Sequence, residues 1–306
     1  MAKRRPSDAM HVTVTDHYIR RRPDRGSAGA LVERNGANTP AYRGEVVLYY
    51  PAAIPERSER ELYVAVAQVR DESNLTEGIR RLEKAMTEFR PAQGGFYLDL
   101  ADAYRHAGRT AEAVDWYREA CGRSPDDWRT FHGLGMELGA TGDFAGAVTA
   151  LDRALSLAPG QIEVLESLAE IFEQQNKLPE AVSTLRRAMA ADPESADIRN
   201  NLGTALVRAG KLDQAEEALR EAVRLRPEVP AMRVNLATLL SRQGRFAEAQ
   251  FEFERAIRLN GAFAAAHSAY ATALAAQGNL SAARDQFQAA LRLNPQLWNT
   301  HNNLGT

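Results

Sequence analysis

The feature that most constrains this chain of 306 residues is an internal period of 34 residues. Prolines follow this period at Pro91, Pro125, Pro159, Pro193, Pro227 and Pro295, and Gly261 fills the one vacant place. A glycine series follows it at Gly108, Gly142, Gly210, Gly244 and Gly278, with Asn176 in the remaining place. Two alanine series, seven residues apart, begin at Ala113 and Ala120. Because such a period is typical of stacked supersecondary units, the chain is predicted to be a repeat array.

Each series has a physical reason if every repeat is a pair of helices joined by a tight turn. Glycine adopts the left-handed conformation that ends a helix without steric cost, and asparagine is its best substitute. Proline cannot donate the next backbone hydrogen bond, so it marks the end of the second helix. Pro179 instead falls where a second helix begins, a position that proline tolerates. Alanines seven residues apart share one helix face, where a larger side chain would overpack the contact with the partner helix.

The apolar residues between these positions recur at helical spacing, as in the stripe of Leu165, Leu168, Ala169 and Phe172. Together with the alanines and prolines they match the pattern W-x-x-L-G-x-x-Y…A-x-x-x-F…A…P, although no repeat has tryptophan in the first aromatic place. The chain thereby resembles the tetratricopeptide repeat family over residues 94–297. The resemblance implies an all-α, right-handed superhelical solenoid of helix-turn-helix repeats. It also implies a scaffold that binds proteins or peptides rather than an enzyme.

The same register sets the expected repeat boundaries. Six full repeats are predicted, at 94–127, 128–161, 162–195, 196–229, 230–263 and 264–297. A degenerate repeat is predicted at 59–91 and a truncated one from 298, so that the array spans 58–306. Because a solenoid normally finishes with a polar capping helix, we expect the chain to be a fragment, or to self-associate through its uncapped last repeat.

Residues 1–57 differ in composition from the array. Residues 1–43 hold nine lysines or arginines against four acidic residues, and a short strand is predicted at 46–50. The segment KRRPSDAMHVTVTDHYIRRRP, followed by YRGEVVLYYP, resembles the end of the haem domain in bacterial multihaem c-type cytochromes that carry tetratricopeptide repeats. This resemblance implies that His11 and His17 are haem ligands in a longer parent protein. The chain itself has no C-x-x-C-H site, so no haem or other cofactor is expected in it.

In tetratricopeptide proteins the concave groove is lined by first-helix positions that do not pack, and the sixth position of the repeat is one of them. Here it holds Asn201, Asn235 and Asn303 in three repeats. An asparagine side chain offers both a donor and an acceptor, so these residues are predicted to bond the backbone of an extended peptide. The alternative is that N-L-G is a common spelling of the repeat, with amides that are only solvated.

Charged residues fall on the same face. Four acidic residues occupy the second, fifth, ninth and twelfth positions of one repeat: Glu163, Glu166, Glu170 and Glu173. Their spacing places all four carboxylates on one face of a helix. Arg208 and Arg242 occupy the thirteenth position of the next two repeats. We predict an acidic patch beside basic anchors that steers a charged partner segment, against the alternative of a solvated helix face.

Histidine and cysteine give little sign of a metal site. His106 and His132 fall on the groove face, but two histidines without a further ligand do not make a zinc site, so we interpret them as polar surface residues. His267 and His301 replace an aromatic residue of the repeat and are predicted to pack. Cys121 is the only cysteine, which excludes a disulfide within the chain.

Composition and missing motifs exclude several functional classes. A formal net charge of −2 argues against a strongly basic nucleic-acid binder. No apolar run approaches the ~20 residues of a transmembrane helix, and the first residues lack the apolar stretch of a signal peptide. We therefore expect no nucleic-acid partner, no membrane insertion and a cytoplasmic location, or an exported one for a cytochrome fragment. The motifs G-x-S-x-G, G-x-x-x-x-G-K-[ST], H-E-x-x-H and G-x-G-x-x-G are absent, so no enzyme activity is expected.

Overall fold

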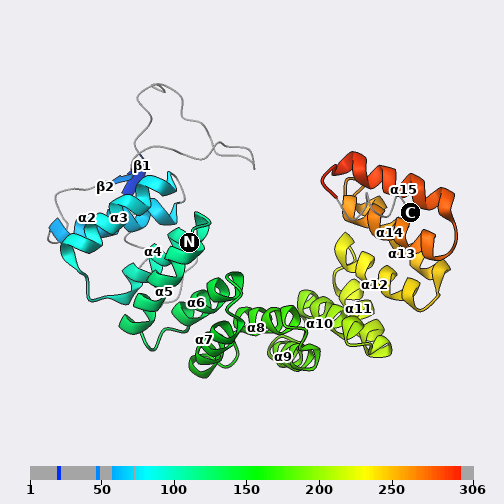
Figure 1. Cartoon of the computed structure of the whole chain (residues 1–306), viewed down its shortest axis with the longest axis horizontal. Coiled ribbons are helices and arrows are strands. Elements are labelled where there is room, and N and C mark those ends of the chain that lie inside the picture. Colours follow the sequence, from blue (N-terminus) through cyan, green and yellow to red (C-terminus); the bar gives the residue numbers. More distant parts are fainter. Residues whose placement is uncertain (1–18, 22–45, 49–56, 72–73, 298–306) are drawn as a thin grey trace, which may run out of the picture. The chain divides into compact units, whose positions relative to one another are not determined.

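The computed structural model describes residues 19–21, 46–48, 57–71 and 74–297, and within them the fold is all-α apart from one pair of short strands (Figure 1). Strand β1 (Ile19–Arg21) pairs antiparallel with β2 (Val46–Leu48), so that Ile19 lies opposite Leu48. The short strand predicted at 46–50 is confirmed in its first three residues.

The helices come in pairs, one pair for each repeat. The first helices of the full repeats are α4 (Gly94–His106), α6 (Trp128–Ala140), α8 (Ile162–Gln174), α10 (Ala196–Arg208), α12 (Pro230–Arg242) and α14 (Ala264–Ala276). The second helices are α5 (Thr110–Arg123), α7 (Phe144–Leu157), α9 (Leu178–Ala191), α11 (Leu212–Leu225), α13 (Phe246–Leu259) and α15 (Leu280–Leu293). The pair α2 (Arg57–Arg70) and α3 (Leu75–Phe89) precedes them. This is the helix-turn-helix architecture that the 34-residue period predicts.

The contacts divide the chain into two compact units, Met1–Pro159 and Gly160–Thr306. Unit 1 holds both strands and helices α2–α7, and unit 2 holds α8–α15. Within a unit each second helix packs against the first helix of the next repeat, as α9 does against α10 and α11 against α12. The division falls between two repeats of the array rather than at the change of composition near residue 57.

The turn between the two helices of each repeat depends on one residue in the left-handed conformation. Gly210, with φ of 74°, ends α10, and the next amide, that of Lys211, donates back to the Leu206 carbonyl at 2.9 Å. Asn176 takes the same conformation with φ of 58° after α8. The sequence prediction for this series is confirmed, and so is the one for Pro179, which lies in the first turn of α9.

The alanine series lie at the contacts between helices. All twelve alanines of the two series are at most 3% exposed. The first helix contributes its own small residue: a Cβ added at Gly203 would lie 2.5 Å from Leu219 Cγ, and one at Gly135 would lie 2.7 Å from Leu151 Cγ. These distances leave no room for a side chain at either glycine, so the two helices of a repeat approach closely because the first helix has glycine where a leucine of the second helix packs against it.

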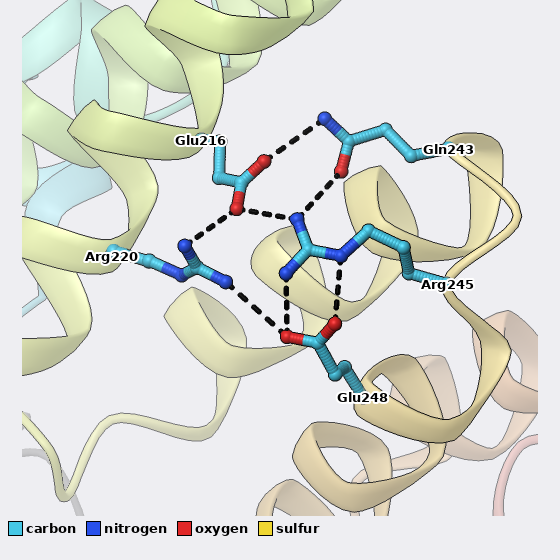
Figure 2. Close-up of polar contacts among 5 residues, drawn as sticks. All are labelled: Glu216, Arg220, Gln243, Arg245 and Glu248. Atoms are coloured by element: carbon cyan, nitrogen blue, oxygen red, sulfur yellow. Dashed lines mark hydrogen bonds and ion pairs between the residues drawn. The ribbon is translucent and has the colours of Figure 1, made fainter.

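Polar groups add a second connection between consecutive repeats in unit 2 (Figure 2). The Glu216 carboxylate of α11 accepts hydrogen bonds from Gln243 at 3.0 Å and from Arg245 at 2.6 Å, and it pairs with Arg220 at 2.6 Å. Glu248 binds both Arg245 and Arg220. Burial would raise the pKa of Glu216, but the hydrogen bonds from Arg245 and Gln243 lower it below its usual value. The network fixes the α12–α13 turn against α11.

Replacing Gly210 by alanine tests the left-handed turn. The substitution places a Cβ on a residue with φ of 74°, which should lower the free energy of unfolding by about 1–2 kcal/mol, measured by urea unfolding followed by circular dichroism. Gly160→Ala is the matched control, because Gly160 lies outside the left-handed region and an added Cβ there meets no atom within 4 Å. An equal loss in both variants would contradict this account of the turn.

Candidate peptide-binding groove

The predicted asparagines are linked across three consecutive first helices of unit 2. Asn201 on α10 donates through Nδ2 to Glu166 Oε1 on α8 at 3.0 Å. Asn235 on α12 donates through Nδ2 to Asn200 Oδ1 on α10 at 2.8 Å. Asn200 Nδ2 lies 3.5 Å from Asn201 Oδ1, which closes a row of amides from α12 to α8. The structure therefore brings together three of the predicted groove residues: Glu166, Asn201 and Asn235.

Asn200 is the member of this row that the sequence reasoning missed. The motif N-N-L-G carries two consecutive amides, and only the second occupies the sixth position of the repeat. Each amide in the row keeps hydrogen-bonding capacity beyond these contacts, since an asparagine side chain has two N–H groups and one carbonyl oxygen. Asn235 Oδ1 accepts no hydrogen bond from the described part of the chain, and the residue is half-buried. The row can therefore bond a peptide backbone with fixed amides.

The four predicted carboxylates differ in their surroundings. Glu163 and Glu170 are exposed, and Glu170 accepts a hydrogen bond from Gln174 at 3.2 Å. Glu166 is half-buried, and burial raises its pKa although the hydrogen bond from Asn201 opposes this shift. Glu173 instead forms an ion pair with Arg208. The uncompensated negative charge of α8 thus comes from its first three acidic residues.

The two predicted arginines also differ. The Arg208 guanidinium pairs with the Glu173 carboxylate, and its Nη2 donates to the Glu173 backbone carbonyl at 3.0 Å. Arg208 thus connects α10 to the end of α8, and its charge is balanced. Arg242 is exposed and forms no hydrogen bond or ion pair with any residue of 57–71 or 74–297. Of the two predicted anchors, Arg242 keeps a free charge.

Unit 1 has a different polar arrangement at the sixth position of the repeat, on the first helix α4. Asp99 occupies the sixth position of its repeat, and Arg70 of α2 donates to its carboxylate at 2.7 Å. Burial raises the pKa of Asp99 to about 6, although the positive charge of Arg70 opposes the shift. The side chain is only 11% exposed, so desolvation of the charged form is the larger effect.

Tyr117 also reaches the first helices of unit 1. Its hydroxyl donates to Asp102 Oδ1 at 2.5 Å and accepts from Arg105 Nε at 3.1 Å. The ring lies where a side chain at the sixth position of the next repeat would be, because a Cβ added at Gly133 would lie 2.2 Å from Tyr117 Cε1. That repeat therefore has no side chain at the sixth position, because the Tyr117 ring occupies the space.

Comparison with known proteins supports the repeat assignment. The model of the tetratricopeptide repeat family matches residues 70–127, 132–196, 167–230, 200–250 and 234–297. The chain belongs to the tetratricopeptide repeat family. A comparison of the sequence with curated proteins gives no significant match.

Solved structures of tetratricopeptide repeat proteins share the fold. A tetratricopeptide repeat protein from Parabacteroides merdae superposes with a TM-score of 0.68 at 17% identity, covering 82% of this chain and 98% of that one. PilF from Pseudomonas aeruginosa gives 0.56 at 20% identity, covering 70% and 97%. MamA from Desulfovibrio magneticus gives 0.52 at 23% identity, covering 56% and 97%. At these identities the similarity shows the fold alone.

The remaining predicted residues of this tetratricopeptide repeat protein fall into two groups. His267 is half-buried and makes polar contacts: its ring nitrogens lie 2.7 Å from Gln286 Oε1 and 3.3 Å from the Gly261 carbonyl oxygen. Cys121 is half-buried, and burial raises the pKa of its thiol. The residues His11, His17, His301 and Asn303, like the truncated repeat from 298, lie outside the described residues.

The described residues hold no cluster of three or more metal-ligating side chains and no membrane-spanning helix. His132 stacks obliquely beside Trp128, with ring centroids 6.1 Å apart. Over the residues that the structure describes, no group of three or more histidine, cysteine, aspartate or glutamate side chains could hold a metal ion. Within the same residues, no helix is long and apolar enough to cross a membrane.

Replacing Asp99 by asparagine tests the buried carboxylate of unit 1. Because the folded-state pKa of about 6 lies above the ordinary value of 3.8, Asp99 contributes stability that is present below pH 4 and lost as the pH rises through 6. Asp99→Asn keeps an acceptor for Arg70 and removes this loss, so the variant should be more stable than the parent at pH 8, on the order of 2–3 kcal/mol. Urea unfolding at pH 8 and pH 4.5 measures the difference, which should shrink at the lower pH. A difference that is independent of pH would contradict the prediction.

Proposed function

We propose that this chain is a protein-interaction scaffold whose unit 2 groove binds an extended segment of a partner protein. The observation that carries the proposal is the row of amides Asn235, Asn200 and Asn201, which ends on Glu166. The row holds side-chain donors and acceptors at fixed positions on three neighbouring helices. Groups of this kind bond a peptide backbone without reading its side chains.

The charges on the first helices suggest which segment fits. Glu163, Glu166 and Glu170 have no cationic partner in the described chain, whereas Glu173 is balanced by Arg208. The surface of α8 therefore attracts positive charge, and we propose that the bound segment carries lysine or arginine where it crosses α8. Arg242 on α12 favours an acidic residue or a free carboxyl group nearer the other end.

A scaffold role fits the family. Tetratricopeptide repeat proteins in general act as non-enzymatic scaffolds that bind peptides or proteins. We include no chemical reaction, no cofactor and no nucleic-acid partner in the proposal. For the location we propose the cytoplasm. We also keep self-association through the truncated repeat from 298 as a proposal, to be tested by sedimentation of the chain with and without an added capping helix.

Peptides selected on the full chain from a random twelve-residue library test the groove. We expect the selected peptides to be rich in lysine and arginine, and to bind more weakly as the salt concentration rises. Asn235→Ala should weaken binding about tenfold by removing backbone hydrogen bonds, measured by fluorescence anisotropy. Glu163→Gln with Glu170→Gln should reduce the salt dependence.

A matched control separates groove contacts from general loss of an amide. Gln250 lies on the second helix α13, where its side chain bonds to Glu254 at 2.8 Å, so Gln250→Ala should leave binding unchanged. The circular dichroism spectrum of Asn235→Ala should equal that of the parent. Selected peptides that bind Asn235→Ala and the parent equally would show that the groove is not the binding site.

A second function rests on the resemblance of the N-terminal segment alone. We propose as the alternative that the repeats are the docking module of an exported multihaem cytochrome, with His11 and His17 as haem ligands. The genomic sequence upstream of Met1 tests this directly. An open frame that runs back through C-x-x-C-H sites to a signal peptide would support it, and an in-frame stop codon with a ribosome-binding site would exclude it.

A further inference from the structure

In three full repeats of this protein the fourth position, on the first helix, contacts the twenty-third, on the second helix. In unit 1 they are Tyr97 and Trp116, whose ring centroids lie 6.1 Å apart. In unit 2 they are polar in the last two full repeats. Arg233 pairs with Glu252 at 2.6 Å, and His267 lies 2.7 Å from Gln286. A cationic or imidazole side chain at position four is thus matched by an oxygen at position twenty-three.

The repeat at 196–229 breaks this rule. Position four is Arg199, but position twenty-three is Ala218, which has no acceptor. Arg199 makes no side-chain hydrogen bond or ion pair within the described residues, and its Nη1 atom is buried without a partner. The neighbouring Arg233 shows what is missing, because its guanidinium contacts both the Glu252 carboxylate and the Pro227 carbonyl. A buried charged donor without an acceptor is costly, which makes Arg199 a candidate ligand-binding group.

Because position twenty-three is alanine in this repeat, there is open space beside Arg199 as well as a donor without an acceptor. Arg199 and Ala218 line an open cavity of about 1310 Å³ that runs along α11. Apolar side chains also line it, among them Met189, Val223 and Leu236. The cavity lies on the side of the second helices and does not include the groove residues Asn200, Asn201 or Asn235. It is therefore separate from the groove proposed above.

The other arginines that line the cavity have partners, whereas the carboxylates of Asp213 and Glu217, which also line it, have none among the described residues. Arg186 donates to Gln214 at 2.7 Å. Arg224 donates through Nε and Nη2 to the two carboxylate oxygens of Glu221, each at 2.7 Å. The charge of Arg199 helps to lower the pKa of Glu221, after the larger effect of the Arg224 hydrogen bond, so the two groups interact without contact. Among the lining cations, Arg199 is the one that keeps a buried donor free within residues 160–297.

We propose that this cavity binds an acidic side chain of a partner protein, and that its carboxylate contacts Arg199 as the Glu252 carboxylate contacts Arg233. Carboxylates form the strongest hydrogen bonds with guanidinium groups, which favours an acidic ligand over a neutral one. The cavity volume exceeds the range of about 300–1,000 Å³ that is usual for small molecules, and its apolar lining offers contact to the chain that bears the carboxylate. A protein segment therefore fits better than a free small acid.

The ligand test uses the full chain and a labelled twelve-residue peptide in which one central glutamate is flanked by alanine and serine. We expect this peptide to bind about tenfold more tightly than the same peptide with glutamine, because one charged hydrogen bond is lost. Arg199→Met should abolish the difference. Arg186→Met removes a cation from the same cavity that already has a partner, so it should leave the difference within about twofold.

An internal test supplies the carboxylate from the chain itself. Ala218→Glu should recreate the pair of Arg233 and Glu252, raise the melting temperature and block the glutamate peptide. Ala150 occupies the same position opposite Phe131, so Ala150→Glu is the matched control and should lower the melting temperature. If Ala218→Glu fails to fold, Ala218→Gln with the peptide measurements on Arg199→Met still tests the site.

Several results would overturn the proposal. Equal binding of the glutamate and glutamine peptides would do so, as would a preference that survives in Arg199→Met. Binding of sodium glutarate that depends on Arg199, without binding of the peptide, would show that the ligand is a small acid instead. If Glu217→Gln lowers the melting temperature as much as Arg199→Met does, Arg199 is paired within the chain, and the site is not free.

Discussion

The close approach of the two helices within each repeat is the contact on which the other features of this protein depend. A Cβ at Gly203 would lie 2.5 Å from Leu219 Cγ, so the leucine of the second helix packs directly on the backbone of the first. The buried alanines at the contacts with neighbouring helices keep the same short separation along the array. Because this geometry is set by small residues at few positions, the remaining first-helix positions are free to vary without loss of the fold.

This freedom explains why the polar rows differ between the two units. In two repeats of unit 2 the sixth position is an asparagine that reaches the neighbouring first helix, as Asn201 reaches Glu166 and Asn235 reaches Asn200. In unit 1 the equivalent residue is Asp99, bound by Arg70, and in the following repeat it is Gly133, which makes room for Tyr117. One backbone scaffold therefore presents amides in one unit and, in the other, the largely buried Asp99 carboxylate and a tyrosine. The two units are chemically distinct surfaces rather than copies.

The fold could be predicted from the sequence because its determinants are local and periodic. The left-handed turn at Gly210 or Asn176 needs only one residue type, and the series of alanines shows the helix contacts directly. The candidate site could be predicted only in part, since partners across repeats depend on side-chain reach. Spacing placed Arg208 and Glu173 on one face, but it did not show that they pair with each other and so cancel their charges. It also missed Asn200, which occupies the fifth position of its repeat, beside the sixth-position asparagines that were singled out.

The fourth position shows how a repeat can gain a binding site without new structure. Where Tyr97 packs on Trp116, the contact is between two uncharged rings. Where Arg233 replaces the aromatic residue, Glu252 supplies the countercharge, and the arginine is only 6% exposed. A buried pair of this kind depends on both partners, because removal of one leaves the other charged and uncompensated. With alanine at position 218, Arg199 is half-buried and its Nη1 is buried without an acceptor, so that a group from outside the described chain, or a rearranged neighbour, can complete the pair. A single small residue is thus enough to turn a structural contact into a site for an acidic ligand.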